Sequence, residues 1–392
     1  MLKKQLGSQY SPMFFLASLG AGGLAVSFFM YLMFMIPHPD TPIVTFNHIW
    51  PYYQQGAIWQ QILISAALLG IVFFAVIHLR LLAWNIKEYR TFKQTEAFKT
   101  LRTSNAEITL MAIPLTLAMT INVLFVMGAV FVPNLWSIKE YLFPFSLLGF
   151  FVIGVYALRV LGEYFTRLFI NADFDFTKNN SLAPMVSIFA LAMIAVGLAA
   201  PAAMSDQPGL VALSIFLSIF FAMLAVLLLV LKLVVGFNDM LRHGVRIEAA
   251  GSLWIIIPIM TILGITYVRL SHGIAHHFIE SSEPISYFLL ISALLSIQII
   301  FGLIGYAVMK QLNYFRDFVR GDKAGAPAFA LICPGVAMFV FGMFFVHLGL
   351  VATQITPIFS PIYFVILLPF ILIQLKTIQV FFGLNKRVLQ AA

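Results

Sequence analysis

Histidines gather near the end of one apolar segment of the chain. The stretch RLSHGIAHHF carries His272, His276 and His277, and His347 lies at a comparable depth in a later apolar segment. His272 and His276 are four residues apart, so they share one face of a helix. Imidazole nitrogens bind haem iron and transition metals, so a haem-binding subunit of membrane electron transfer is one function that these residues allow. No second cluster or quinone-site motif accompanies them, and we therefore predict no bound metal and no cofactor.

Motifs of enzymatic catalysis are missing from the sequence. It has no GxSxG nucleophile elbow, no HExxH zinc motif and no phosphate-binding glycine-rich loop. Cys333 is the only cysteine, which excludes an internal disulfide and any multi-cysteine metal or iron-sulfur site built by this chain alone. We expect a protein that is not an enzyme.

Charged side chains inside apolar segments are a strong functional signal, because burying a charge in a membrane is costly. Arg269 lies near one end of segment 251–275, where it either attracts anions or extends outward to the membrane surface. Glu163 has Arg159 and Arg167 one turn to either side, which favours structural pairing. No carboxylate remains for a proton relay, so passive conduction is favoured over coupled transport.

Neutral polar side chains also occur in two of the apolar segments. Thr116, Thr120 and Asn122 lie in one of them, and Thr261 and Thr266 lie in another. These side chains either line a pore as hydrogen-bonding groups or, for the hydroxyls, bond to the backbone of their own helix. The sequence leaves both alternatives open.

The apolar segments belong to an integral membrane protein. The chain is 61% hydrophobic and only 10% charged, whereas soluble domains are about 25% charged. A window of roughly 20 residues, the length that crosses a bilayer as a helix, predicts ten spans, which we number one to ten. They cover residues near 12–36, 57–84, 107–132, 141–168, 182–204, 209–237, 251–275, 285–310, 327–353 and 359–384. We predict one transmembrane domain over residues 1–392 and no soluble domain.

Lysines and arginines are distributed unequally between the two sides. The net charge is +8, and all of the 23 basic residues except Lys139 and Arg269 fall on the side that also carries both termini. The positive-inside rule makes this side cytoplasmic. We predict a multi-pass protein of the plasma membrane or the bacterial inner membrane. Anionic lipid attracts such basic loops, so we expect no nucleic-acid partner.

Prolines recur at one depth in the odd-numbered spans. Pro114, Pro258 and Pro334 each lie about seven residues into spans three, seven and nine, and Gly335 follows the last of them. Proline removes a backbone donor and clashes with the preceding turn, and within a membrane only protein or water can satisfy the freed carbonyl. The sequence therefore predicts an all-α membrane protein of five helical hairpins whose kinked odd helices lie inside the bundle.

Span one contains the aromatic and glycine-rich segment FFLASLGAGGLAVSF. Its glycines, Gly20, Gly22 and Gly23, give a surface without side chains that allows close approach. With ten spans in five hairpins and both termini inside, the chain resembles the tellurite-resistance/dicarboxylate transporter family, which includes TehA-like proteins and the slow anion channels of plants. The resemblance implies an inner ring of odd helices around a central pore, an outer ring of even helices, a homotrimer, and an anion pore occluded by a phenylalanine on helix nine.

The position of this phenylalanine follows from helix geometry in our chain. Span nine reads ALICPGVAMF around its proline, which places Cys333 near the expected gate. At 100° per residue, Met338, Phe341 and Phe345 lie within about 40° of one line through Pro334. We predict Phe341 as the pore gate, with Phe345 and Met338 beside it.

The predicted function is conduction of small inorganic or organic anions through a narrow apolar pore. One alternative is a secondary transporter that exports a dicarboxylate or an oxyanion of sulfur or tellurium. The other alternative is the haem-binding electron-transfer subunit that the histidines allow.

Overall fold

The computed structural model describes residues 2–171, 181–277 and 284–390. Within these residues ten helices are long and apolar enough to cross a membrane, and no β-strand is formed. The protein is therefore an all-helical integral membrane protein, as the sequence predicts. The spans are Pro12–Met35, Ile58–Phe92, Asn105–Phe131, Leu135–Asn171, Ala183–Met204, Pro208–His243, Ile247–Ala275, Tyr287–Gln311, Ala326–Val351 and Pro361–Leu389.

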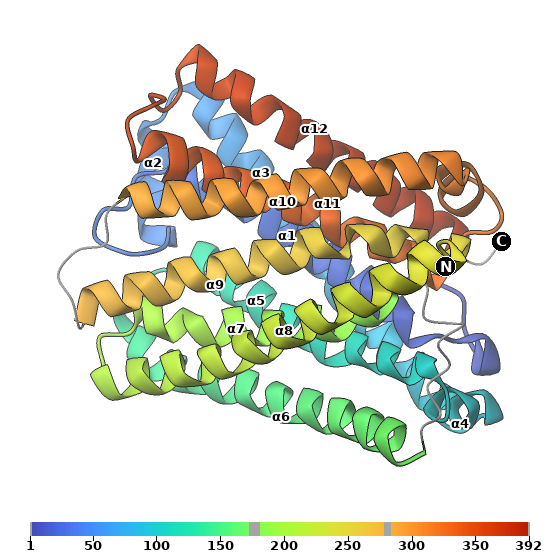
Figure 1. Cartoon of the computed structure of the whole chain (residues 1–392). Coiled ribbons are helices and arrows are strands. Elements are labelled where there is room, and N and C mark those ends of the chain that lie inside the picture. Colours follow the sequence, from blue (N-terminus) through green and yellow to red (C-terminus); the bar gives the residue numbers. More distant parts are fainter. Residues whose placement is uncertain (1, 172–180, 278–283, 391–392) are drawn as a thin grey trace.

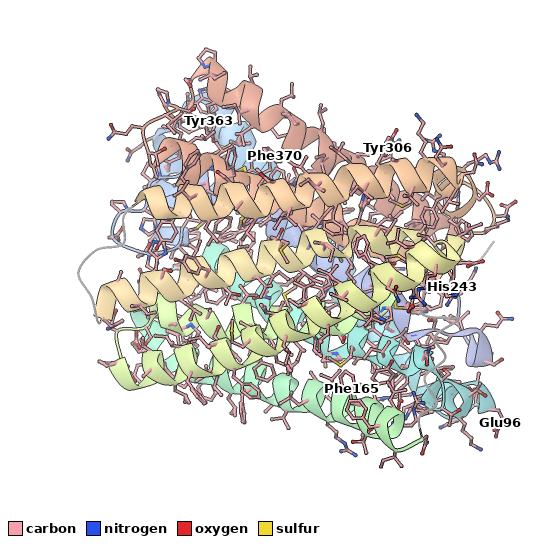
Figure 2. The ribbon with its side chains drawn as sticks, viewed as in Figure 1. Glu96, Phe165, His243, Tyr306, Tyr363 and Phe370 are labelled. Atoms are coloured by element: carbon pink, nitrogen blue, oxygen red, sulfur yellow. The ribbon has the colours of Figure 1, made fainter. Side chains whose placement is uncertain are left out.

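Twelve α-helices make up most of the described chain. The helices of the spans are α1 (Phe15–Met35), α3 (Ile58–Phe92), α5 (Ala112–Phe131), α6 (Lys139–Asn171), α7 (Val186–Met204), α8 (Pro208–His243), α9 (Ile256–His277), α10 (Pro284–Gln311), α11 (Ile332–Phe344) and α12 (Pro361–Leu384). Two short helices, α2 (Phe46–Gln55) and α4 (Glu96–Arg102), lie in the connections that follow spans one and two. Figure 1 shows the long helices side by side, with both chain termini at one end of the bundle. We call this end the terminal end; Figure 2 places Glu96 and His243 near it and Tyr363 toward the opposite end.

The odd-numbered spans form the centre of the bundle and the even-numbered spans surround them. In the most apolar part of each odd span, between 61% and 89% of the residues are buried, compared with 22% to 33% in each even span. Large apolar side chains on the helices of the even spans are exposed, such as Phe216, Leu227 and Val234 on α8. Soluble proteins rarely expose such large apolar surfaces to water, so these faces contact lipid. The predicted placement of the odd helices inside the bundle is confirmed.

Each odd span begins at the terminal end with a short 3-10 segment that continues into its α-helix. These segments are Pro12–Phe14, Asn105–Met111, Ala183–Met185, Ile247–Ile255 and Ala326–Leu331. Pro114, Pro258 and Pro334 are each the third residue of the α-helix that follows. The first N–H groups of an α-helix have no partner within that helix, so proline removes no α-helical hydrogen bond there. The breaks expected as kinks within the spans are therefore junctions between 3-10 and α winding near one end.

Polar side chains of the outer helices attach them to the inner ones. On α3, His78 is within 2.9 Å of the Thr120 hydroxyl and 2.8 Å of the Ser18 carbonyl. On α12, the Gln374 amide donates to the Ser27 hydroxyl over 2.8 Å. Lipid is as apolar as the helices, so the hydrophobic effect does not hold membrane helices together. Hydrogen bonds between them therefore contribute to their association. The two rings are therefore joined by specific contacts as well as by packing.

Candidate functional site

Two consecutive cavities lie among the odd spans. The larger, which we call the vestibule, has a volume of about 560 Å³ and is lined at the terminal end by residues of all five odd spans, including Met13, Ile108, Val186, Ile255 and Ala330. The five spans begin at this end, so the vestibule lies where their first turns meet.

The smaller cavity, which we call the inner cavity, has a volume of about 150 Å³ and lies deeper in the bundle. It is again lined by all five odd spans, through residues that include Gly20, Asn122, Met193, Thr261 and Val340. Both cavities therefore lie on the axis that the odd helices surround.

Three residues line both cavities and mark the boundary between them. They are Phe189 on α7, Pro258 on α9 and Cys333 on α11. Each lies within the first four residues of its α-helix, at the level of the junction with the 3-10 segment. We call this constriction the neck. The vestibule, neck and inner cavity form one path that starts at the terminal end.

Arg269 provides the positive charge of the inner cavity. It lies on α9, thirteen residues after the first residue of that helix, and its side chain is only partly exposed. One guanidinium nitrogen donates to the Val196 carbonyl over 2.7 Å, and no carboxylate of the described chain forms an ion pair with it. A guanidinium has five N–H donors, so most of its hydrogen-bonding capacity is available to an occupant of the cavity.

Two neutral polar residues accompany Arg269 in the lining of the inner cavity. The Asn122 amide has only the Met193 sulfur, 3.5 Å away, as its partner, and sulfur is a weak acceptor. The Thr261 hydroxyl lies 3.1 Å from the Ile257 carbonyl and 3.2 Å from the Ala337 carbonyl, and it accepts from the Gln298 amide over 3.0 Å. Most of the remaining lining is apolar. The cavity therefore offers one charge and few other donors.

The connection between α1 and α2 closes the inner cavity at the end away from the termini. Ile43 of this connection contributes to the lining, and the neighbouring Val44 is fully buried. A hydrogen bond of 2.8 Å from His48 to Asp40 and another of 3.1 Å from the Thr45 backbone to His48 fix the connection. The inner cavity is thus bordered by the neck on one side and by this connection on the other.

The three residues predicted as the gate lie on another face of span nine, Met338 and Phe341 in α11 and Phe345 directly after it. Met338, Phe341 and Phe345 line neither cavity. The Phe341 ring lies against Gly264 of α9, where a Cβ would come within 2.7 Å of it, and Phe345 stacks on Phe288 of α10.

The cavity face of α11 explains this placement. It is formed by Cys333, Val336, Ala337 and Val340. Cys333, Val336 and Val340 lie about 80° or more around the helix from Phe341, and Ala337, at about 40°, lies at the edge of this face. The prediction assumed that the side of the helix that carries Pro334 faces the pore. In the structure the side chains on that side, Phe341 and Phe345, pack against α9 and α10 instead.

The glycines of span one face two different neighbours. Gly20 and Gly23 line the inner cavity, and a Cβ on either would approach Ile332 or Val336 of span nine to 2.8 Å and 3.1 Å. Gly22 does not line the inner cavity, and a Cβ on it would come within 2.6 Å of Met119 and 2.9 Å of His78. Two of the three glycines thus permit the close approach of α1 and α11 beside the path.

The predicted polar lining is only partly brought to the path. Asn122 and Thr261 line the inner cavity, but Thr116, Thr120 and Thr266 line neither cavity. The hydroxyls of these three threonines donate to the carbonyl four residues earlier, over 2.8 to 2.9 Å. Intrahelical bonding, the alternative that the sequence left open, is what the structure shows for them.

The histidines near the opposite end contact different elements. His272 stacks on Tyr287 of α10, and His277 lies 2.9 Å from the Ser205 carbonyl. The two ring nitrogens of His347 lie 2.8 Å from the Met343 carbonyl and 2.9 Å from the Tyr363 hydroxyl. The His276 side chain lies outside the described residues. No group of three or more metal-binding side chains occurs in the described parts of the chain.

Charges at the terminal end are paired beside the vestibule. Glu163 bonds to Arg159 over 2.9 Å, as predicted, but its second partner is Arg102 at 2.8 Å. Arg167 instead pairs with Glu107 at 2.9 Å, and Arg102 also reaches this buried carboxylate. Short-range helix spacing identified one pair and missed the contacts that the 3-10 segment of span three supplies.

Comparison with known proteins adds no assignment. No protein-family model matches the chain. No curated protein and no solved structure matches it either. The functional argument therefore rests on the cavities and on the residues that line them.

Sequence reasoning missed several residues that the structure makes important. His78, Gln298 and Gln374 are fully or almost fully buried polar residues in even spans, and an isolated polar residue in an apolar span is the signal that marks them. Phe189 carries no such signal, because it is one of 40 phenylalanines in the chain.

Proposed function

We propose that the protein conducts small anions across the membrane through the vestibule, the neck and the inner cavity. Ten apolar helices suggest a membrane transporter or channel. The observation that carries the choice of anions is Arg269, which lines the inner cavity without an ion pair to any described carboxylate.

The helix arrangement supports the same sign of charge. The α-helices of the five odd spans all begin beside the vestibule. The start of an α-helix carries a partial positive charge of about half an elementary charge. Residues in the first turns, such as Val186, Pro258 and Cys333, line this cavity. Anions arriving at the terminal end therefore meet several converging positive helix ends before they reach Arg269.

The composition of the inner cavity favours weakly hydrated anions. Side chains such as Val126, Met193 and Val336 cannot replace the water that a strongly hydrated ion loses. One arginine neutralises one negative charge, whereas a second buried charge would stay uncompensated. Small monovalent anions fit these conditions better than divalent ones.

A carrier for a dicarboxylate or for an oxyanion of sulfur or tellurium is the second candidate. The observation in its favour is that the inner cavity is bordered by the neck at one end and by Ile43 of the α1–α2 connection at the other. A carrier would expose such a site to each side in turn. Reversal potentials that follow the anion gradient in planar bilayers distinguish a channel from a carrier.

We also infer a relationship to the tellurite-resistance/dicarboxylate transporter family, which the two rings and the five hairpins support. On the same basis we propose a homotrimer in the plasma membrane or the bacterial inner membrane. The terminal end is then cytoplasmic, because it carries nearly all of the 23 basic residues. No catalytic or cofactor role is included in this proposal.

The test of the proposed function is the anion flux of Arg269 variants in proteoliposomes. Removing a unit charge about 4 Å from a bound anion costs several kcal/mol at an effective dielectric constant of about 20. We expect Arg269→Gln to lower flux at least tenfold, and Arg269→Lys to retain much of it. Arg159→Gln is the matched control, because Arg159 is 77% exposed and lines neither cavity.

Salt dependence adds a second arm to this test. A charge at an exposed outer mouth, as the sequence placed it, would be screened at high ionic strength, whereas a partly buried charge is screened much less. We therefore expect the loss in Arg269→Gln to persist at high salt. Parental flux in well-folded Arg269→Gln at every salt concentration would refute the proposed function.

A further inference from the structure

The neck is formed by three side chains of unequal freedom. Pro258 is held by its own ring closure, and Cys333 is small. Phe189 is the only one of the three that is both large and able to rotate about its side-chain bonds. The width of the path at this level therefore depends mainly on the position of the Phe189 ring.

Phe189 borders a cavity on each side, unlike the buried rings of Phe150 and Phe341. It borders the vestibule on one side and the inner cavity on the other. By contrast, the rings of Phe150 and Phe341 fill positions directly against Gly197 and Gly264, where a rotation would displace packed neighbours. A ring with a cavity on either side can change its rotamer without such repacking.

The sequence around Phe189 holds its backbone in place while leaving its ring free. Phe189 is the fourth residue of α7, directly after the 3-10 segment Ala183–Met185, and nearly every residue of α7 is buried. The helix lies against α8 on its outer side, where Ser214 and Ser218 donate to the Leu198 and Ala195 carbonyls. The backbone of α7 is therefore held by packing and by these hydrogen bonds, so a change of width at the neck would come from the Phe189 side chain.

We propose that Phe189 determines the size of solute that passes between the vestibule and the inner cavity. The proposal rests on the proposed function for the identity of the solute, but the constriction itself can be measured without any anion flux. In this proposal the aromatic residue that restricts passage belongs to span five, and not to span nine as the sequence predicted.

The experiment uses thiol modification beyond the neck. The single native cysteine is removed by Cys333→Ala, and Val340→Cys introduces one thiol that lines only the inner cavity. A membrane-impermeant methanethiosulfonate reagent is added from the vestibule side of oriented vesicles, and the modification rate is measured. Phe189→Ala is compared with Phe125→Ala, which removes a ring of the same size from the inner cavity without touching the neck.

We expect Phe189→Ala to raise the modification rate at position 340 at least tenfold, and Phe125→Ala to leave it within about twofold of the parent. Phe189→Trp should lower the rate. Equal rates in the Phe189 and Phe125 variants would overturn the proposal. Phe189→Leu, a smaller change, provides the same comparison at an intermediate size if the alanine variant does not fold.

Anion flux measured on the same vesicles separates the two hypotheses. Faster modification in Phe189→Ala without anion flux in any variant supports the neck and refutes the proposed function. Anion flux with unchanged modification rates supports the function and refutes the role of Phe189. If both hold, Phe189→Ala should also admit larger monovalent anions that the parent excludes.

Discussion

Gly335 gives the most direct test of the helix packing around the path. A Cβ at this position would lie 3.0 Å from the Thr377 Cβ and 3.2 Å from its Cγ2, and closer still to its hydroxyl oxygen. Rotating the threonine side chain would move its hydroxyl oxygen, but the Thr377 Cβ would stay in close contact. The threonine hydroxyl also donates to the Ile373 carbonyl over 2.7 Å, a bond that a rotation would break.

These contacts set the expected size of the effect. Overpacking of this kind costs about 1–3 kcal/mol, while alanine gains about 1 kcal/mol over glycine inside a helix. We expect Gly335→Ala to lower the free energy of unfolding by up to about 2 kcal/mol, and by about 1–3 kcal/mol relative to a helix glycine whose Cβ would meet no neighbour. Thr377→Ala removes two of the three contacting atoms, so the double variant should recover part of this loss, with a coupling energy of about 1 kcal/mol.

Unfolding by titration with denaturing detergent provides the assay. Gly162→Ala on α6 is the control, because no atom lies within 4 Å of the position of its Cβ, and it should be neutral or stabilising. If Gly335→Ala is as stable as Gly162→Ala, the close contact between α11 and α12 does not explain the glycine. The Pro-Gly pair would then need another explanation.

Three further outcomes are expected from other parts of the molecule. Glu107→Gln should cost about 1–3 kcal/mol in the same unfolding assay, because Arg102 and Arg167 both contact the buried Glu107 carboxylate at 2.9 Å. An unchanged free energy would refute the importance of this network. Gln298→Leu should change stability by less than about 1 kcal/mol, because its buried carbonyl oxygen has no hydrogen-bond partner; a large loss would show that this oxygen is satisfied. The hydrogen bond from His48 lowers the pKa of the Asp40 carboxyl, so the contact is present above the ordinary carboxyl pKa and is lost as pH falls through the lowered value. A spin label at position 43 should therefore gain mobility below about pH 4, and in Asp40→Asn it should be equally mobile at all pH values.

The sequence predicted the number of spans and the inner position of the odd helices for clear physical reasons. A run of about 20 apolar residues is required to cross a bilayer, and the recurrent Pro114, Pro258 and Pro334 mark one junction in three of the five odd spans. Neither signal depends on long-range contacts. Both could therefore be read from a single chain.

The direction that each inner helix faces could not be predicted in the same way. Helix periodicity shows that Met338 and Phe341 lie on the same side of α11, but lipid-facing, packed and path-lining faces are all apolar in a membrane protein. Without a contrast between polar and apolar faces, the phase of the helix relative to the axis stays undetermined. The contacts of Gly264 and Thr261 with α11 fix this phase, and only the folded structure supplies them.

The path described above is built from one chain alone. All of the described residues that line the vestibule, the neck and the inner cavity belong to the five odd spans of the same molecule or to the connections beside them. Under the proposed function, each copy in an oligomer would therefore conduct through its own path, and a blocked copy would leave the path of its neighbour unaffected. If the protein conducts anions as proposed, currents through mixed assemblies should decrease in proportion to the fraction of subunits blocked at the neck.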